Sequence, residues 1–216
     1  AWKETPVEAS RLAGNGADFE TPEVGGFTSM AVGDIDMDGD MDIVVAWNSS
    51  CGEGGTIDVV LFSNEGPSAV RDGTSVATPI PNSIPVGTAV KDVALGDIDA
   101  DGDLDIVATF PDAGSMNIRW FRNPTLDVVD DFHISDGIWQ VGTVAQIATQ
   151  ADVIKIADLD GDGLLDVVMR STAGKLIQWL KGPGMQATTA PLPQIPWQVY
   201  TLAEFTERTP QALAVG

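Results

Sequence analysis

Aspartate recurs at every second position in three short stretches of the chain. The stretches are GDIDMDGDMD at 33–42, GDIDADGDLD at 96–105 and ADLDGDGLLD at 157–166, and each contains the pattern D-x-D-x-D-G-x-x-D. Carboxylates at alternate positions can curl around one cation, and the glycine permits the sharp turn that brings the chain back toward it. The spacing therefore predicts three metal-binding loops.

Each loop offers four carboxylates, and the residue at its seventh position can add a backbone carbonyl. The predicted ligands are Asp34, Asp36, Asp38, Asp40 and Asp42 in the first loop, Asp97, Asp99, Asp101, Asp103 and Asp105 in the second, and Asp158, Asp160, Asp162, Leu164 and Asp166 in the third. With a water molecule, such a set approaches the about 6–8 hard oxygen ligands of Ca²⁺. We therefore expect about three Ca²⁺ ions, one per loop. If the protein is extracellular, we expect weak binding, with dissociation constants of roughly 10⁻⁴–10⁻³ M.

Other metal sites fit the loops less well. Mg²⁺ demands strict octahedral geometry and resists dehydration, and zinc sites normally use Cys and His ligands, which these loops lack. An EF-hand requires glutamate at the twelfth position, where this chain has Val45, Ala108 and Met169. Calcium remains the expected ion, and the geometry predicts a structural role, because protein oxygens fill the site and leave no open position for a substrate.

The charge of the chain excludes two classes of partner. The sequence has 32 Asp and Glu against 11 Lys and Arg, a net charge of −21, and the three loops hold five, five and four of these acidic residues. Nucleic acids and anionic membranes are bound through Lys and Arg, so we expect neither as a partner. No apolar run of about 18 residues is present, so membrane insertion is not expected.

The elements that must position the loops recur with them. The first aspartates stand at 34, 97 and 158, which gives intervals of 63 and 61 residues and indicates a repeat. In the second unit, β-prone segments occupy 91–97, 104–110, 116–122 and 138–145, and no segment shows sustained helical periodicity. Four antiparallel strands per repeat of about 60 residues predict an all-β fold of β-propeller blades, with each acidic loop between the first two strands.

The repeat boundaries divide the chain into three complete blades and two partial ones within a single β-propeller region over 1–216. The expected blades are 26–87, 88–148 and 149–208. Residues 1–25 match the last strand of a preceding blade plus a linker, and 209–216 match the first strand of a following blade. A closed propeller has at least about four blades. We therefore expect a segment of a larger propeller, or one that closes through other blades of a longer chain or by self-association.

The acidic loop between the first two strands of a four-stranded repeat resembles the FG-GAP/VCBS repeat of integrin α-subunits and many secreted bacterial proteins. The segments WFRNP at 120–124 and WLKGP at 179–183 are similar to the bacterial VCBS-type version. The resemblance implies a seven- or eight-bladed calcium-binding propeller on a bacterial protein that is secreted, exposed at the cell surface or periplasmic.

The leading hypothesis for function is a recognition or adhesion module that binds a protein or a glycan. Its ligand would bind the face opposite the calcium loops, which carries 48–55, 111–115 and 172–174 and the loops between blades, because variable loops on a rigid scaffold commonly bind ligands. Two alternatives are a propeller that forms part of a secreted carbohydrate-active enzyme, a lyase or hydrolase, and an architectural repeat of a surface assembly. No catalytic motif occurs, so we expect no catalytic residues.

The tryptophans separate into recurrent and single positions. Trp120 and Trp179 occupy equivalent third-strand positions, and Trp139 and Trp197 equivalent fourth-strand positions, which predicts packing between blades. The other two repeats have no tryptophan at the position equivalent to Trp47. Two interpretations of this residue stay open: a sugar-stacking platform or an ordinary strand residue. We expect no catalytic role for the single cysteine, Cys51, or the single histidine, His133, and we expect both in loops. Residues 48–50 match the sequence pattern of an N-glycosylation site.

Overall fold

The computed structural model describes residues 25–49, 59–64, 76–80, 90–110, 118–124, 139–145, 147, 149–182, 197–207 and 211–215. Within these ranges the chain is all β, and none of the residues is helical. The predicted fold class is therefore confirmed.

The strands form three antiparallel sheets of four strands each, and every sheet follows the chain order. The first sheet contains β1 (Gly25–Gly33), β2 (Asp42–Ser49), β3 (Val59–Ser63) and β4 (Val76–Pro79). The second contains β5 (Val93–Gly96), β6 (Asp105–Thr109), β7 (Ile118–Arg122) and β8 (Gln140–Ala145). The third contains β9 (Val153–Ala157), β10 (Asp166–Ser171), β11 (Leu176–Lys181) and β12 (Gln198–Glu204). This sequential order is that of propeller blades.

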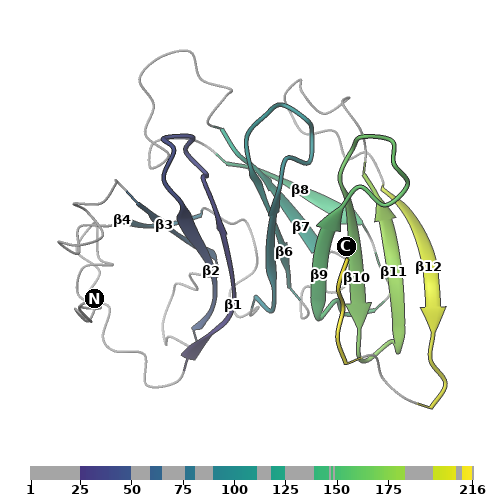
Figure 1. Cartoon of the computed structure of the whole chain (residues 1–216). Helices are drawn as coiled ribbons and strands as arrows, with labels where there is room; N and C mark the ends of the chain where they lie inside the picture. Colours follow the sequence, from purple (N-terminus) through teal and green to yellow (C-terminus); the bar gives the residue numbers. More distant parts are fainter. Residues whose placement is uncertain are drawn as a thin grey trace.

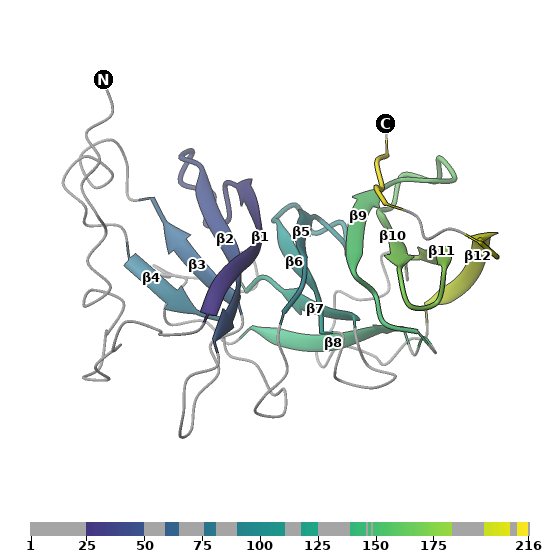
Figure 2. The ribbon, with the colours of Figure 1, turned by 90° about the horizontal axis from the view of Figure 1, so that it is seen from below.

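The sheets lie side by side as blades (Figure 1). The first strands are neighbours, since β1 contacts β5 and β5 contacts β9. Figure 2 shows β1, β5 and β9 along one side of the fan, with β4, β8 and β12 away from it. The first strand of each sheet is therefore its inner strand, as in a propeller.

Two apolar cores fill the spaces between the sheets. In the second sheet, alternate residues supply both cores, because successive side chains of a strand point to opposite faces. Ile106 and Ala108 of β6 pack toward the first sheet, whereas Val107 packs toward the third. All five residues of β6 and all five of β7 are buried for this reason. The sheet is covered on both faces, which explains the apolar run of Ile106, Val107 and Ala108 in β6.

Three of the four recurrent tryptophans lie between sheets, as the sequence predicts. Trp139 belongs to the core between the first and second sheets, and Trp120 and Trp197 belong to the core between the second and third. Trp179 belongs to neither core. It is half-buried on the outer side of the third sheet, where its ring stacks on Tyr200 with 4.8 Å between centroids.

Glycines allow the inner strands to approach closely just before the acidic loops. A Cβ at Gly33 would lie 2.7 Å from the Leu104 side chain of the second sheet, and one at Gly96 would lie 2.8 Å from Ile156 of the third. The equivalent residue of the third sheet is Ala157, which no further described sheet approaches. The G-D pair at the start of the first two loops is therefore a packing requirement as well as a turn signal.

The buried carboxylate of Asp92 links all three sheets, a feature that the sequence analysis did not anticipate. Asp92 Oδ1 accepts hydrogen bonds from Ser29 Oγ of the first sheet at 2.5 Å and from Val93 N at 3.1 Å. Its Oδ2 accepts one from Ile154 N of the third sheet at 2.9 Å. The side chain therefore joins neighbouring inner strands where they meet.

Parts of the predicted domain organisation lie outside the described residues. These include 1–24, where the strand of a preceding blade is expected, and most of the loops at the predicted ligand face. Residues 211–215, within the segment matched to the first strand of a following blade, form no strand. The blade boundaries and the two partial blades remain predictions.

Candidate metal centres

Each acidic loop connects the inner strand of a sheet to the second strand. The loops follow β1, β5 and β9 and lie at the same end of the three sheets, at the top of Figure 1. The last residue of the inner strand pairs with the ninth residue of the loop, as in Gly33↔Asp42 and Gly96↔Asp105. The hairpin geometry therefore brings the first and ninth aspartates of a loop close together.

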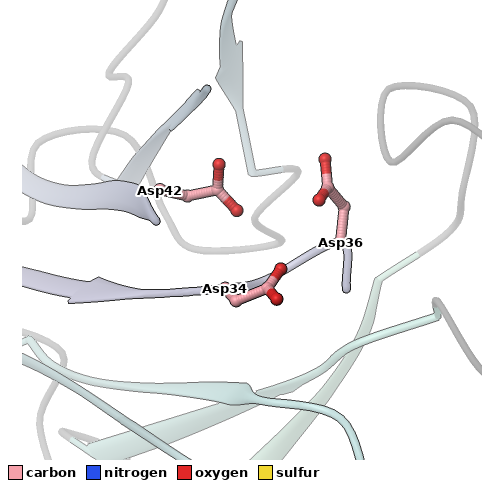
Figure 3. Close-up of side chains that lie close together, drawn as sticks. All are labelled: Asp34, Asp36 and Asp42. Atoms are coloured by element: carbon pink, nitrogen blue, oxygen red, sulfur yellow. The ribbon is translucent and has the colours of Figure 1, made fainter. Parts of the chain in front are cut away.

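Each loop gathers three carboxylates into one small volume. One oxygen from each of Asp34, Asp36 and Asp42 lies within 4.8 Å of the others, and Figure 3 shows the three side chains around a common space. The other two groups, with the same spacing, are Asp97, Asp99 and Asp101, and Asp158, Asp160 and Asp166. Three groups of carboxylates that could hold a metal ion are therefore present where the sequence predicts them.

The remaining predicted ligands lie in the same loops but outside these groups: Asp38, Asp40, Asp103, Asp105, Asp162 and Leu164. The fifth-position carboxylates shape the turn, since Asp38 Oδ1 accepts a hydrogen bond from Asp40 N at 2.8 Å and Asp162 Oδ1 one from Leu164 N at 3.0 Å. The side chain of Asp103, the residue predicted to contribute its backbone carbonyl, is buried. The role of these six residues as ligands stays a prediction.

The glycine at the sixth position supplies the expected turn. Gly39, Gly102 and Gly163 have φ angles of 94°, 105° and 86°, a region that other residues rarely adopt. Their N–H groups donate to the first carboxylate of the same loop, as from Gly39 N to Asp34 Oδ2 at 3.0 Å. Folding of the loop therefore places the first carboxylate at its centre.

The ninth aspartate joins three parts of its sheet. Asp42 Oδ2 accepts from Ile35 N, and its Oδ1 accepts from Asn64 N just after β3, both at 2.8 Å. Asp105 and Asp166 make the same pair of contacts in their own sheets, with Asn123 N and Gly182 N as the partners that follow the third strand. The aspartate therefore holds its loop against the second and third strands.

The last residue of the third strand also faces the acidic loop. Arg122 Nε donates to Asp99 Oδ2 at 2.6 Å, and its Nη2 donates to Asp101 Oδ2 at 3.2 Å. Lys181 contacts Asp160 and Asp162 in the same way. The sequence analysis missed these contacts, although both cations lie in the segments WFRNP and WLKGP.

Burial opposes the ionisation of several loop carboxylates. It raises the pKa of Asp105 to about 8, although the N–H of Asn123 acts in the opposite direction. Burial also raises the pKa of Asp36, Asp42 and Asp99, and neighbouring carboxylates add to the effect at Asp36 and Asp99. Crowded, desolvated carboxylates are stabilised in their charged form by a bound cation.

The donor set fits a hard cation. Asp99 is fully buried, and its Oδ1, like Asp34 Oδ1, has no hydrogen-bond partner among the residues that the structure describes. Such atoms normally have a partner, which is a protein group, a water or an ion. Both belong to the first or third position of a loop, where the spacing predicts calcium ligands. The arrangement can bind a cation, and none of its described contacts is that of an activated nucleophile.

Several residues singled out in the sequence lie outside the described part of the chain. They are Cys51, Ser50, His133 and most of the loops 48–55 and 111–115. Asn48 and Ser49 belong to the end of β2, and the turn at 172–174 lies between β10 and β11. The predictions for the ligand face therefore stay predictions.

Comparison with known proteins supports the repeat assignment. Residues 97–169, from the first aspartate of the second loop into β10, match the family model of the FG-GAP-like repeat. No curated protein sequence matches the chain. Among the described residues, no helix is long and apolar enough to cross a membrane.

Proposed function

We propose that this FG-GAP-like repeat chain is a calcium-binding β-propeller module in which one ion stabilises each blade. The observation that carries the proposal is that each of the three acidic loops gathers three carboxylates, which include those at its first and third positions. Each group lies in a hairpin loop whose backbone is already folded around its first aspartate. Calcium is favoured because it accepts many oxygen ligands in flexible geometry.

The proposed role of calcium is structural. The candidate ligands of each ion belong to one local loop, and the ninth aspartate of that loop also links the second and third strands. An ion at the loop would neutralise carboxylates that burial keeps from ionising easily, and so would stabilise the inner hairpin of the blade.

The test combines calorimetric titration with calcium and thermal melting in calcium, in magnesium and in excess chelator. We expect about three binding events and a melting temperature that is higher in calcium than in magnesium or chelator. Substituting Asp34, Asp97 or Asp158 with asparagine, which keeps the side-chain shape, is expected to weaken one site each. An unchanged melting temperature in chelator, together with no heat of calcium binding, would refute the proposal.

The two outer sheet faces support packing against further blades. On the third sheet, Tyr200 of the outer face is 42% exposed, and Leu202 of the same strand is 52% exposed. Tyr200 lies opposite Trp179 in the strand register, as Gly142 lies opposite the buried Trp120 in the second sheet. The third sheet covers the face of the second sheet that carries Trp120. The equivalent face of the third sheet, which carries Trp179, has no described sheet against it, and a blade of the same kind would fit there.

The first sheet has an exposed apolar face of its own. Met30, Val32 and Ile43 are 66%, 58% and 41% exposed, and Val32 and Ile43 are neighbours in the register. We include in the proposal that both outer faces contact blades of a longer chain or of a second copy. The molar mass in solution, measured by light scattering at several concentrations, distinguishes these sources: a concentration-dependent dimer indicates the second copy.

Recognition of a protein or glycan outside the cell is the proposed biological role of the module. It is supported by the repeat family and by the strand order, which places the turn at 172–174, between β10 and β11, at the end of its sheet opposite the acidic loop. A glycan array and a binding screen with surface proteins test it. Turnover of a polysaccharide by the chain would instead support the carbohydrate-active enzyme, and binding only to further blades would support the architectural repeat.

A further inference from the structure

One position faces all three acidic loops and differs in charge from loop to loop. It is the last residue of the third strand: Ser63 in β3, Arg122 in β7 and Lys181 in β11. The residue that follows it donates its backbone N–H to the ninth aspartate in every sheet. These three residues are therefore structurally equivalent, although one is neutral and two are cationic.

The two cationic side chains contact the carboxylates at the third and fifth positions of their loops. Arg122 contacts the second loop at 2.6 and 3.2 Å and is 3% exposed, which makes it a buried and doubly bonded cation. Its guanidinium cannot lose its charge in a protein.

Lys181 Nζ lies 2.6 Å from Asp162 Oδ2 and also contacts Asp160, but this lysine is 28% exposed. A lysine has a flexible stem, so its ammonium group can leave the loop without breaking any packing between sheets.

Ser63 makes a neutral contact with the first loop. Its Oγ donates to Asp36 Oδ2 at 3.3 Å. Because it carries no charge, it does not offset the charge of the three gathered carboxylates or repel an approaching cation.

We infer that the residue at this position sets the calcium affinity of its loop, so that the loops bind in the order 34–42, then 158–166, then 97–105. The inference rests on the proposed calcium function. An intramolecular cation occupies carboxylate oxygens that a metal requires, and its positive charge opposes the metal. Arg122 and Lys181 each contact two carboxylates, but Arg122 opposes the metal more because its side chain is buried, whereas Lys181 can move into solvent.

The test exchanges the charges between loops in the full chain. S63K places in the first loop the residue that the third loop carries, and we expect it to weaken the tightest site at least about tenfold, or about 1.4 kcal/mol. R122Q keeps most of the side-chain volume without the charge, and we expect it to strengthen the weakest site by a similar factor. Lys175 lies in the turn between β10 and β11, at the end of the sheet opposite the acidic loop, so K175Q is the matched control for the loss of one positive charge.

Calorimetry with calcium gives the site affinities, and terbium luminescence gives an independent binding curve. Circular dichroism checks that each variant folds. Should R122Q fail to fold, K181Q tests the same inference at the intermediate loop, where the expected gain is smaller. Sites whose affinities do not change in S63K and in R122Q or K181Q would overturn the inference and leave the calcium function in place. Absence of calcium binding by the unsubstituted chain would instead refute the proposed function itself.

Discussion

Substitution of Asp92 measures how strongly one buried carboxylate joins the three sheets. Its two oxygens accept hydrogen bonds from Ser29 Oγ, Val93 N and Ile154 N, which belong to three different sheets. The side chain is 7% exposed, and Ile154 is fully buried. Loss of the carboxylate therefore leaves donors that water reaches poorly.

The expected cost follows from these contacts. A buried donor left without an acceptor costs about 1–3 kcal/mol, and a hydrogen bond to a charged group contributes about 1.5–3 kcal/mol. D92A removes the acceptor of all three donors, so we expect it to lower the free energy of unfolding by about 3–5 kcal/mol. D92N keeps one oxygen acceptor but loses the charge, for an expected cost of about 2 kcal/mol, and S29A removes one donor, for about 1 kcal/mol.

Urea unfolding in excess chelator, followed by tryptophan fluorescence and circular dichroism, gives these free energies without a contribution from calcium. A typical domain has about 5–15 kcal/mol in total, so a loss of about 4 kcal/mol moves the midpoint strongly. The reasoning would be refuted if the free energy of unfolding of D92A lay within about 0.5 kcal/mol of that of the unsubstituted chain, because ordinary surface substitutions have effects of this size. A cost for S29A as large as that for D92A would also contradict the reasoning, because it would place the effect in the serine alone.

Three further predictions use the same unfolding assay. W120A should lower the free energy of unfolding by about 3–5 kcal/mol, whereas W179A, at the equivalent but half-buried position, should cost clearly less; equal costs would contradict the placement of Trp120 between sheets. N123A removes a buried amide that donates to carbonyls of both the first and second acidic loops. We expect it to lower the free energy of unfolding by about 1–3 kcal/mol, and an unchanged free energy would mean that water replaces the amide. Burial tends to raise the pKa of Asp152, but hydrogen bonds from Lys91 and a backbone N–H outweigh burial and lower the pKa. The carboxylate therefore stabilises the fold at neutral pH, and this stabilisation is lost as the pH falls through the folded-state pKa. K91M should therefore cost up to about 1 kcal/mol at pH 7, and the difference from the unsubstituted chain should vanish in acid; a difference that persists there would assign the effect to packing of the lysine stem.

Much of the candidate site could be predicted because its parts lie close together in the chain. The first and ninth aspartates of a loop are eight residues apart, and the glycine between them has the positive φ that the turn requires. Short-range spacing of this kind is visible in any single copy, and three copies at a regular interval indicate a blade. The four-stranded sheets followed from the same repeat and from the β-prone runs.

The contacts between an acidic loop and the third strand of its sheet, and those between neighbouring sheets, could not be predicted in this way. Arg122 reaches Asp99 across 23 positions of the chain, and Asp92 reaches Ile154 across 62. A pattern of residue types shows that an arginine ends a strand, but not that its side chain turns into the acidic loop of the same sheet. Hydrogen-bond partners of this kind depend on strand register and on the packing of one sheet against the next.

The positions of the acidic loops, the repeat and the all-β fold class could therefore be predicted from the residue types alone, since these features depend on the local conformation of a few consecutive residues. The packing of the sheets decides which carboxylates contact an internal cation, which tryptophan is only half-buried and which aspartate links the sheets. The physical reason is burial: equivalent residues such as Trp120 and Trp179 have the same local sequence role, but only one of them is covered by a neighbouring sheet.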